Sequence, residues 1–390
     1  MRLFRSSSAY SRLSMILVLS VLGVQYSGAE EHQGHFTARS MVLYDTTIVR
    51  QPGEVIHDAT LLIKDGVIQF AGPSGEFEAV QEAYRINGKG LTVYAGFIDS
   101  YSITGIDGQL IRARSGESRE IDYSSSSFGL TPADNRRGMT PEFQVIDGIQ
   151  TRQLLQRSRR EQGITSALVA PGGRIASGQS ALMSLNGLPR RESVIQSPIA
   201  LHLSFQRPNS RGYPTTVMGL VAHLRQGMSD AEYQTRWVQF FNEYGGRRPP
   251  VDPSLDALRQ AQLRVYPVYW AADTQDEIHT ALNLSREFGL TPVIVGGRDA
   301  WKVSDRLSQE GVAVVLRLNF EELPEWSKEV PGLPASQRVL HERQRLWNET
   351  VSCSRRLKAA GVKLAFSSDG TADPKNFREQ LISGHKCNLR

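Results

Sequence analysis

Four joints of the same kind recur between residues 159 and 366. In each joint an amphipathic stretch ends at a glycine, and a short run that is apolar on both faces follows. The glycines and their runs are Gly163 with 164–169, Gly289 with 290–295, Gly311 with 312–316, and Gly361 with 362–366. Helices often end at a left-handed glycine, and a parallel strand covered by helices is apolar on both faces. The pattern predicts an α/β fold, but it does not separate an open sheet from a closed barrel.

Amphipathic helices are predicted between these joints. A strand at 264–270 is followed by a helix from Thr274, whose acidic first turn suits the helix dipole. Val217, Leu220, Val221 and Leu224 share one helical face, and a second helical set consists of aromatic residues: Tyr233, Trp237, Phe240, Phe241 and Tyr244. We expect these aromatics to pack in the core, because a stripe at helical spacing is typical of a buried face.

Short strands also follow one another before this region, from about residue 38 to residue 86. Val42, Leu43 and Tyr44 form one apolar run, and the runs 59–63 and 66–70 are joined through Asp65-Gly66. An Asp-Gly pair between two such runs predicts a two-residue hairpin. The region is an all-β module that is too small to bury enough apolar surface for a stable core of its own.

The N-terminus has the pattern of an export signal. Arg2, Arg5 and Arg12 precede the apolar run 15–24, and small residues at 27–29 offer a cleavage site. The run is too short for a comfortable permanent span of a bilayer. We expect residues 1–29 to be removed and the mature chain to be secreted or periplasmic, with no membrane attachment after cleavage.

Composition narrows the class of protein further. The chain has 390 residues, 40% hydrophobic residues and a mean hydropathy of −0.32, which is typical of a soluble globular protein. Its net charge is +5, but the basic residues are scattered, so we expect no nucleic-acid partner. Only Cys353 and Cys387 occur, which predicts no disulfide framework. Cys353 shares a helical face with Leu346, Leu357 and Ala360, and we expect a buried free thiol.

The stretch 90–103, with the sequence GLTVYAGFIDSYSI, resembles the first barrel strand of the amidohydrolase superfamily. That strand has the pattern G-hydrophobic-x-V-x-P-G-F-I-D-x-H-x-H. The segments 139–149, 163–173 and 177–181 are similar, in order and spacing, to those of the secreted, imidazolonepropionase-related branch. The resemblance covers residues from about 38 to 381.

The resemblance implies a (β/α)8 TIM-like barrel of the amidohydrolase type over residues 91–390. Residues 30–90 then form a small N-terminal β-sandwich half-domain, whose second half comes from the end of the chain in family members. The implied chemistry is hydrolysis of a carbon–nitrogen bond other than a peptide bond in a small molecule. In that chemistry a divalent metal activates water and a carboxylate moves the proton.

The resemblance carries over one catalytic and metal-binding residue, Asp369, after the last barrel strand. The two histidines of the first strand are replaced by Tyr101 and Ile103. Trp270 and the segment 295–298 stand where other members often have histidines, and no lysine ligand is found by position. One carboxylate cannot hold a catalytic zinc ion, so we expect no cofactor, or a divalent metal such as zinc only through unusual ligands.

The histidines do not replace the missing ligands. Most lie in tail, strand or helix positions where surface or core roles are expected: His32, His35, His57, His223, His279 and His341. His202 lies in a strand-like run, and a structural histidine is favoured there over a ligand.

Three functional hypotheses remain open. The first is a hydrolase of the amidohydrolase family whose activity is weak or lost. The second is a non-catalytic exported ligand-binding protein that uses Tyr101, Trp270 and Arg298 as contacts. The third is a truncated inactive fragment, since the family's closing segment G-x-I-x-x-G-x-x-A-D is not found before Arg390. An unpaired strand edge in the sandwich would then favour self-association.

Overall fold

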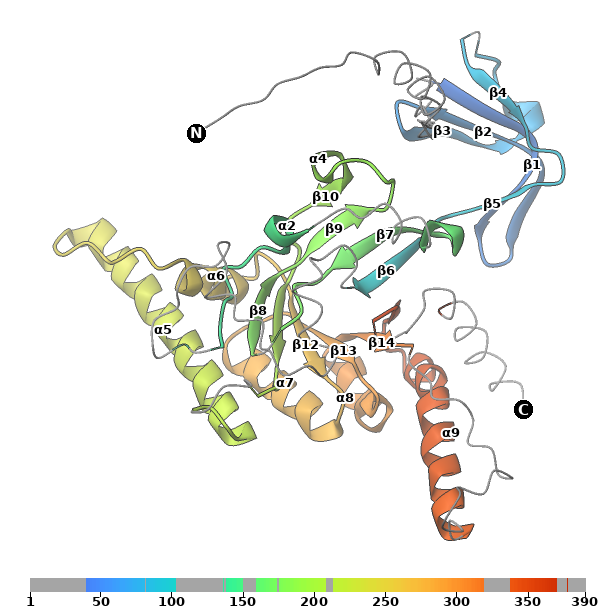
Figure 1. The fold of residues 1–390 in the computed structure, drawn as a ribbon. Coiled ribbons are helices and arrows are strands. Elements are labelled where there is room, and N and C mark those ends of the chain that lie inside the picture. Colours follow the sequence, from blue (N-terminus) through green and yellow to red (C-terminus); the bar gives the residue numbers. More distant parts are fainter. Residues whose placement is uncertain are drawn as a thin grey trace, which may run out of the picture. The chain divides into compact units, whose positions relative to one another are not determined.

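The computed structural model divides the chain into two compact units, Met1–Ala95 and Gly96–Arg390 (Figure 1). It describes residues 40–80, 82–102, 136, 138–149, 159–173, 175–207, 213–318, 337–369 and 377. The predicted export signal, Ile103, Cys387 and the predicted truncation lie outside the described residues. The domain boundary predicted at residue 90 falls five residues before the division between the units.

The first unit is a single sheet in the order β3-β2-β1-β4, with β5 also paired to β1. Its strands are β1 (Ser40–Gln51), β2 (Glu54–Lys64), β3 (Val67–Pro73), β4 (Tyr84–Asn87) and β5 (Thr92–Tyr94), and a short 3-10 helix, η1, spans Ser74–Glu76. The first three strands are antiparallel neighbours, while β4 and β5 run parallel to β1. Ile48, Ala59 and Leu61 form its buried cluster.

The predicted hairpin is confirmed between β2 and β3, where Lys64 pairs with Val67. Asp65 and Gly66 have φ angles of 51° and 77°. A two-residue turn of type I′ needs positive φ at both central positions, and glycine and aspartate tolerate it better than most residues. The Asp-Gly pair therefore fixes the register of these two strands.

The second unit has two sheets, β10-β9-β7-β6 and β15-β14-β13-β12-β11-β8. The first contains β6 (Phe97–Ser102), β7 (Ile164–Val169), β9 (Ala181–Ser184) and β10 (Val194–Gln196). The second contains β8 (Ala176–Gln179), β11 (Leu201–Ser204), β12 (Val268–Ala272), β13 (Pro292–Gly296), β14 (Ala313–Arg317) and β15 (Leu364–Ser367). Strands β11 to β15 are parallel, and β6 is parallel to β7. This is the mixed α/β architecture that the glycine joints predict.

Two features connect these sheets. Strand β8 pairs with β11 and β9 pairs with β7, both antiparallel, and only Ser180 separates β8 from β9. At the other ends of the two sheets, β6 lies beside β15. There the Ser367 hydroxyl donates a 2.6 Å hydrogen bond to the Tyr101 carbonyl oxygen.

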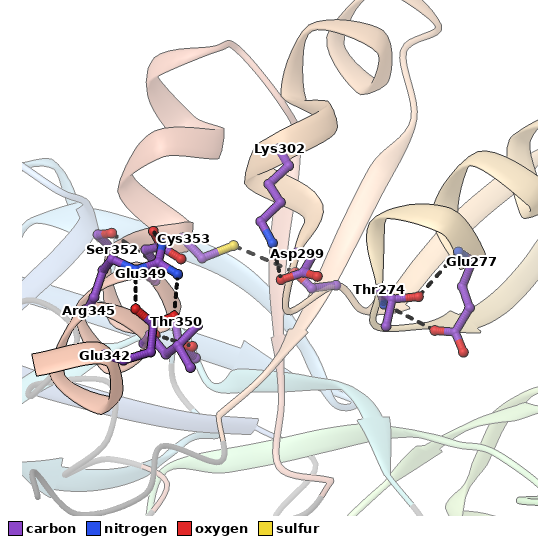
Figure 2. A network of polar contacts seen from close by, with 12 residues as sticks. Thr274, Glu277, Asp299, Lys302, Glu342, Arg345, Glu349, Thr350, Ser352 and Cys353 are labelled. Carbon is purple, nitrogen blue, oxygen red and sulfur yellow. Dashed lines mark hydrogen bonds and ion pairs between the residues drawn. The ribbon is translucent and has the colours of Figure 1, made fainter. Parts of the chain in front are cut away.

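Helices α5 (Val217–Tyr244), α6 (Pro253–Gln262), α7 (Gln275–Glu287), α8 (Ser304–Gln309) and α9 (Gln337–Ala359), with the 3-10 helix η4 (Ala300–Val303), pack on the second sheet. The short helices α2 (Val145–Gly148) and α4 (Arg190–Ser193) lie beside the first sheet, near β9 and β10 (Figure 1). The main core cluster joins strands β11, β12, β13 and β14 to helices α5, α6, α7 and α9. Thr274 caps α7 with a capping box to Glu277, as the acidic first turn predicts (Figure 2).

All four glycine joints are confirmed. Gly163, Gly289, Gly311 and Gly361 have φ angles of 84°, 68°, 67° and 78°, and the strands β7, β13, β14 and β15 follow them. A helix often ends at a residue in this left-handed conformation. Glycine adopts the conformation without the strain that a Cβ atom would cause, so it is favoured at these four positions.

The predicted core role of the aromatic residues at the end of α5 is wrong. Leu220 and Leu224 on the same helix are buried, and no α5 residue after Ala231 is buried. Tyr233, Phe240 and Tyr244 are 61%, 58% and 67% exposed. The helical spacing was recognised correctly, but these side chains lie on a different face of the helix from the one that packs on the core. We call Tyr233, Trp237, Phe240 and Tyr244 the aromatic stripe.

Cys353 is a buried free thiol on α9, as predicted. Its sulfur points toward the Gly297 carbonyl oxygen at 3.6 Å (Figure 2). Burial raises the pKa of this thiol to about 11. Leu357 shares the burial, whereas Leu346, which was expected on the same face, is exposed.

Among the described residues, no helix is long and apolar enough to cross a membrane.

Candidate functional site

Charged side chains meet at the carboxyl ends of three parallel strands. Arg317 is the last residue of β14, Asp273 follows β12, and Asp369 follows β15. The Arg317 side chain lies 3.0 Å from the Asp369 carboxylate through Nε and 3.1 Å from the Asp273 carboxylate through Nη1. One guanidinium thus lies within ion-pair distance of two carboxylates, at the edge of the sheet where sites in parallel α/β proteins are found.

Gly296, the last residue of β13, makes room for this network. A Cβ atom at this position would lie 2.3 Å from Asp273 Oδ1 and 3.2 Å from Arg317 Nη1, and the backbone has a φ of 102°. Both the space and the conformation therefore require glycine. The backbone of β13 fixes where the Asp273 carboxylate can lie.

A second charged pair lies between β6 and β15. The Asp99 side chain on β6 is fully buried, and Arg159 Nη1 lies 2.7 Å from its Oδ2 atom. The Ser368 amide donates a 3.0 Å hydrogen bond to Asp99 Oδ1, and the Ser368 hydroxyl donates to Oδ2. Arg159 Nη1 also donates to the Ser368 hydroxyl. Asp99 therefore ties the start of the second unit to the residue beside Asp369.

Burial sets the electrostatics of this pair. It raises the pKa of Asp99, and the hydrogen bond from Ser368 and the charge of Arg159 oppose that rise. Burial also lowers the pKa of Arg159, against the attraction of Asp99. Each ion is thus poorly solvated and depends on the other for its charge to be tolerated.

His202 on β11 is a structural histidine in a closed aromatic setting. Its ring lies 5.6 Å from that of Tyr101 and 5.3 Å from that of Tyr269. The side chain is buried, and its Nε2 atom has no hydrogen-bond partner among the described residues. Burial lowers the pKa of His202 to about 3, so the imidazole is neutral at physiological pH. The structure places it in the interior, and no second histidine of the described residues lies beside it.

The three predicted ligand contacts are not brought together. Trp270 is buried on the side of β12 that faces α7, where its Nε1 atom donates a 3.0 Å hydrogen bond to Ser285 and its ring stacks on Phe205. Tyr101 is buried in a cluster with Val295 and Val315. Only Arg298 is exposed. Trp270 and Tyr101 are therefore core residues, and the prediction that they contact a ligand does not fit the structure.

The side chains at the strand ends do not fit a catalytic metal. Within the described ranges, no three His, Cys, Asp or Glu side chains are grouped so that they could hold an ion. Asp369, the one residue that the family resemblance assigns to a metal, lies in an ion pair with Arg317, although the Arg317 Nε atom has no hydrogen-bond partner among the described residues. An arginine keeps its positive charge at all relevant pH values and has no lone pair to offer a metal, so it repels a cation from the carboxylate.

Comparison with solved structures finds an amidohydrolase from Thermotoga maritima MSB8. The TM-score is 0.68 at 18% sequence identity, and the match covers 90% of this chain and 84% of that chain. This chain has the fold of that amidohydrolase. A putative prolidase from Bifidobacterium longum is also similar, with a TM-score of 0.44, 14% identity and coverage of 90% of this chain and 79% of that chain. At these identities the likeness is one of fold. No family model and no curated protein matches the sequence.

The sequence predicts Asp369 at this edge, and it does not single out the neighbouring Arg317 and Asp273 or the pair of Asp99 with Arg159. The sequence does contain a signal for both residues. Arg317 is the last residue of the apolar strand β14, and Asp273 directly follows the apolar strand β12. A charged residue at that place faces the edge of the sheet where sites lie. Which residue pairs with which depends on strand order, and this order is not readable from one chain.

Neutralising Asp99 is expected to destabilise the second unit. Asp99→Asn removes the carboxylate that directly contacts the largely buried Arg159 guanidinium, and breaking one side of such a pair costs about 3–5 kcal/mol. Urea unfolding followed by tryptophan fluorescence measures the loss. The double variant Asp99→Asn with Arg159→Met removes both charges and should recover more than half of it. Asp65→Asn, in an exposed turn, is the control and should change the free energy by less than about 0.5 kcal/mol. If Asp99→Asn lowered the free energy of unfolding by no more than the control Asp65→Asn does, the stabilising role of the Asp99–Arg159 pair would be contradicted.

His202 is expected to make the protein less stable in mild acid. Its pKa in the folded state, about 3, lies below the ordinary value of 6.5, so the unfolded chain binds the proton first. Stability is therefore complete above pH 6.5 and falls below it, by up to about 1.4 kcal/mol per pH unit. Unfolding free energies at pH 7, 6 and 5 measure this slope. His202→Phe should flatten it, whereas His57→Gln, at an exposed strand position, should not. Equal slopes in all three proteins would refute the assignment.

Proposed function

We propose that this chain is a relative of the metal-dependent carbon–nitrogen hydrolases of the amidohydrolase superfamily, in the imidazolonepropionase-related branch, and that its own hydrolytic activity is weak or lost. The ion pair between Arg317 and Asp369 is the observation that carries the proposal. It occupies the one carboxylate that the resemblance assigns to the metal. The fold shared with the Thermotoga maritima amidohydrolase is compatible with this origin.

The chemical argument rests on what hydrolysis of an amide needs. A bound metal lowers the pKa of water to about 7 and polarises the carbonyl, and a free carboxylate then moves the proton. Asp369 is paired with a permanent cation, and His202 is enclosed by two tyrosine rings. The described residues therefore favour a site in which protein charges replace the metal, and we place no reaction step in it.

We also infer that the strands of the second unit belong to a closed barrel of the TIM type. The contact of β6 with β15 and the continuous segment 176–184 between β7 and β11 support this inference. The sheet of the first unit corresponds in this view to half of a β-sandwich. An experimental structure in which β6 and β15 lie apart would contradict the barrel.

Arg317 is expected to keep divalent metals out of the site. Purified protein should contain less than about 0.1 equivalent of zinc, iron or manganese by elemental analysis, and should hydrolyse a panel of small cyclic and acyclic amides no faster than buffer. Arg317→Met leaves Asp273 and Asp369 without their cation, so thermal shift by zinc or manganese should be larger than for the wild type. Arg298→Met, at an exposed position outside the ion pairs, is the matched control and should respond as the wild type does.

Two results would overturn the proposal. One is about one equivalent of metal in the wild type together with amide hydrolysis that a chelator abolishes. The other is an equal response of the wild type and Arg317→Met to added metal, which would show that Arg317 does not exclude the ion.

We further propose that the chain is exported. The support is the sequence of residues 1–29, with its basic start, short apolar run and small residues before Glu30. Expression of the full-length chain in a host with a secretion pathway should yield a product that starts near Glu30, as measured by intact mass. A replacement of Leu17 and Leu19 by arginine should prevent the cleavage. A product that keeps residues 1–29 in both proteins would refute export.

A further inference from the structure

The C-terminal half of α5 projects from the second unit with an exposed aromatic surface. In Figure 1 this helix, in yellow-green, extends past α6. Its middle is held by α6, where Gln262 donates a 3.0 Å hydrogen bond to the Met228 carbonyl oxygen. From Glu232 to Tyr244 no residue of α5 is buried. The aromatic stripe lies on this part of the helix.

The stripe is separated from the face of α5 that packs on the core. At about 3.6 residues per turn, it is rotated by roughly 140° from the mean direction of the buried residues Leu220 to Ala231. Its members follow one another at intervals of four, three and four residues, which is the spacing of a coiled-coil seam. Large exposed aromatic surfaces of this kind are unusual on monomers and mark interaction sites.

Among the described residues, no segment covers one flank of the stripe, where Glu232, Arg236 and Glu243 are exposed. On the other flank, the segment after α5 folds back, where Trp237 Nε1 donates to the Arg247 carbonyl oxygen and Gln234 Nε2 donates to that of Pro250, each at 3.2 Å. The open flank carries Arg236 and Glu243, one on each side of Phe240 along the helix. Glu232 lies on this flank as well. The flank therefore carries two acidic side chains and one basic side chain. An amphipathic helix that binds lipid has a basic polar face, so a membrane is disfavoured.

We propose that the aromatic stripe binds the same stripe of a second copy of this chain, with the two α5 helices antiparallel. In a pairing centred between Val238 and Gln239, Trp237 faces Phe240 of the second copy, and Tyr233 faces Tyr244 of the second copy. The same register brings Arg236 beside Glu243 of the second copy, and the two-fold axis repeats this ion pair. The charges on the open flank therefore complement themselves only in the antiparallel arrangement.

Charge exchange tests the register. Sedimentation-velocity measurements over a range of concentrations should show a monomer–dimer equilibrium for the wild type. Arg236→Glu places two acidic groups together and Glu243→Arg places two basic groups together, so each should raise the dissociation constant about tenfold. The double variant, Arg236→Glu with Glu243→Arg, restores both pairs and should return it close to the wild-type value. A mixture of the two single variants should form heterodimers.

Further measurements distinguish loss of the dimer from loss of folding. All substituted side chains are exposed, and circular dichroism should show that each variant is folded. Phe240→Ser removes a central apolar contact and should abolish the dimer, whereas Tyr84→Ser, at an exposed position in the first unit, should not. A monomeric wild type, or charge variants that dimerise as the wild type does, would overturn the proposal. Binding of the monomer to anionic lipid vesicles, lost in Phe240→Ser, would assign the stripe to a membrane instead.

Discussion

The buried ion pair between Asp99 and Arg159 is the constraint on which the rest of the second unit depends. Asp99 is fully buried and the Arg159 side chain is only 12% exposed, so each charge depends on the other, and Ser368 donates hydrogen bonds to Asp99. Because Asp99 lies on β6 and Ser368 follows β15, satisfying the pair also fixes where β15 ends. Asp369 and its partner Arg317 take their positions from that strand end. The geometry of the candidate site is thus a consequence of one unsolvated carboxylate.

The charged side chains at the strand ends are therefore paired with one another. Arg317 contacts both Asp273 and Asp369, Arg159 contacts Asp99, and the neutral ring of His202 lies between tyrosines. The fold shared with the Thermotoga maritima amidohydrolase is thus combined in this chain with strand ends whose charged side chains contact one another.

Local structure was predictable from the sequence where one residue decides the backbone. The glycine joints and the Asp-Gly hairpin were correct because positive φ excludes most other residues. The position of Asp369 followed from a family pattern. The aromatic stripe was misplaced because spacing identifies a helical face but not the partner of that face. The ion pairs were missed for a related reason, since they join strands that are adjacent only in the folded sheet.

The contact of β6 with β15 also has a consequence for how the chain folds. The hydrogen bonds from Ser367 to Tyr101 and from Ser368 to Asp99 span 266 and 269 residues of sequence. Contacts of such long range form late, because the entropy of the intervening chain is lost before they stabilise anything. During synthesis Asp99 emerges long before Ser368 exists. The growing chain therefore cannot complete the hydrogen bonds of Asp99, or the contact of β6 with β15, until β15 is made, and in that interval the open edge of β6 is exposed to aggregation and to capture by chaperones.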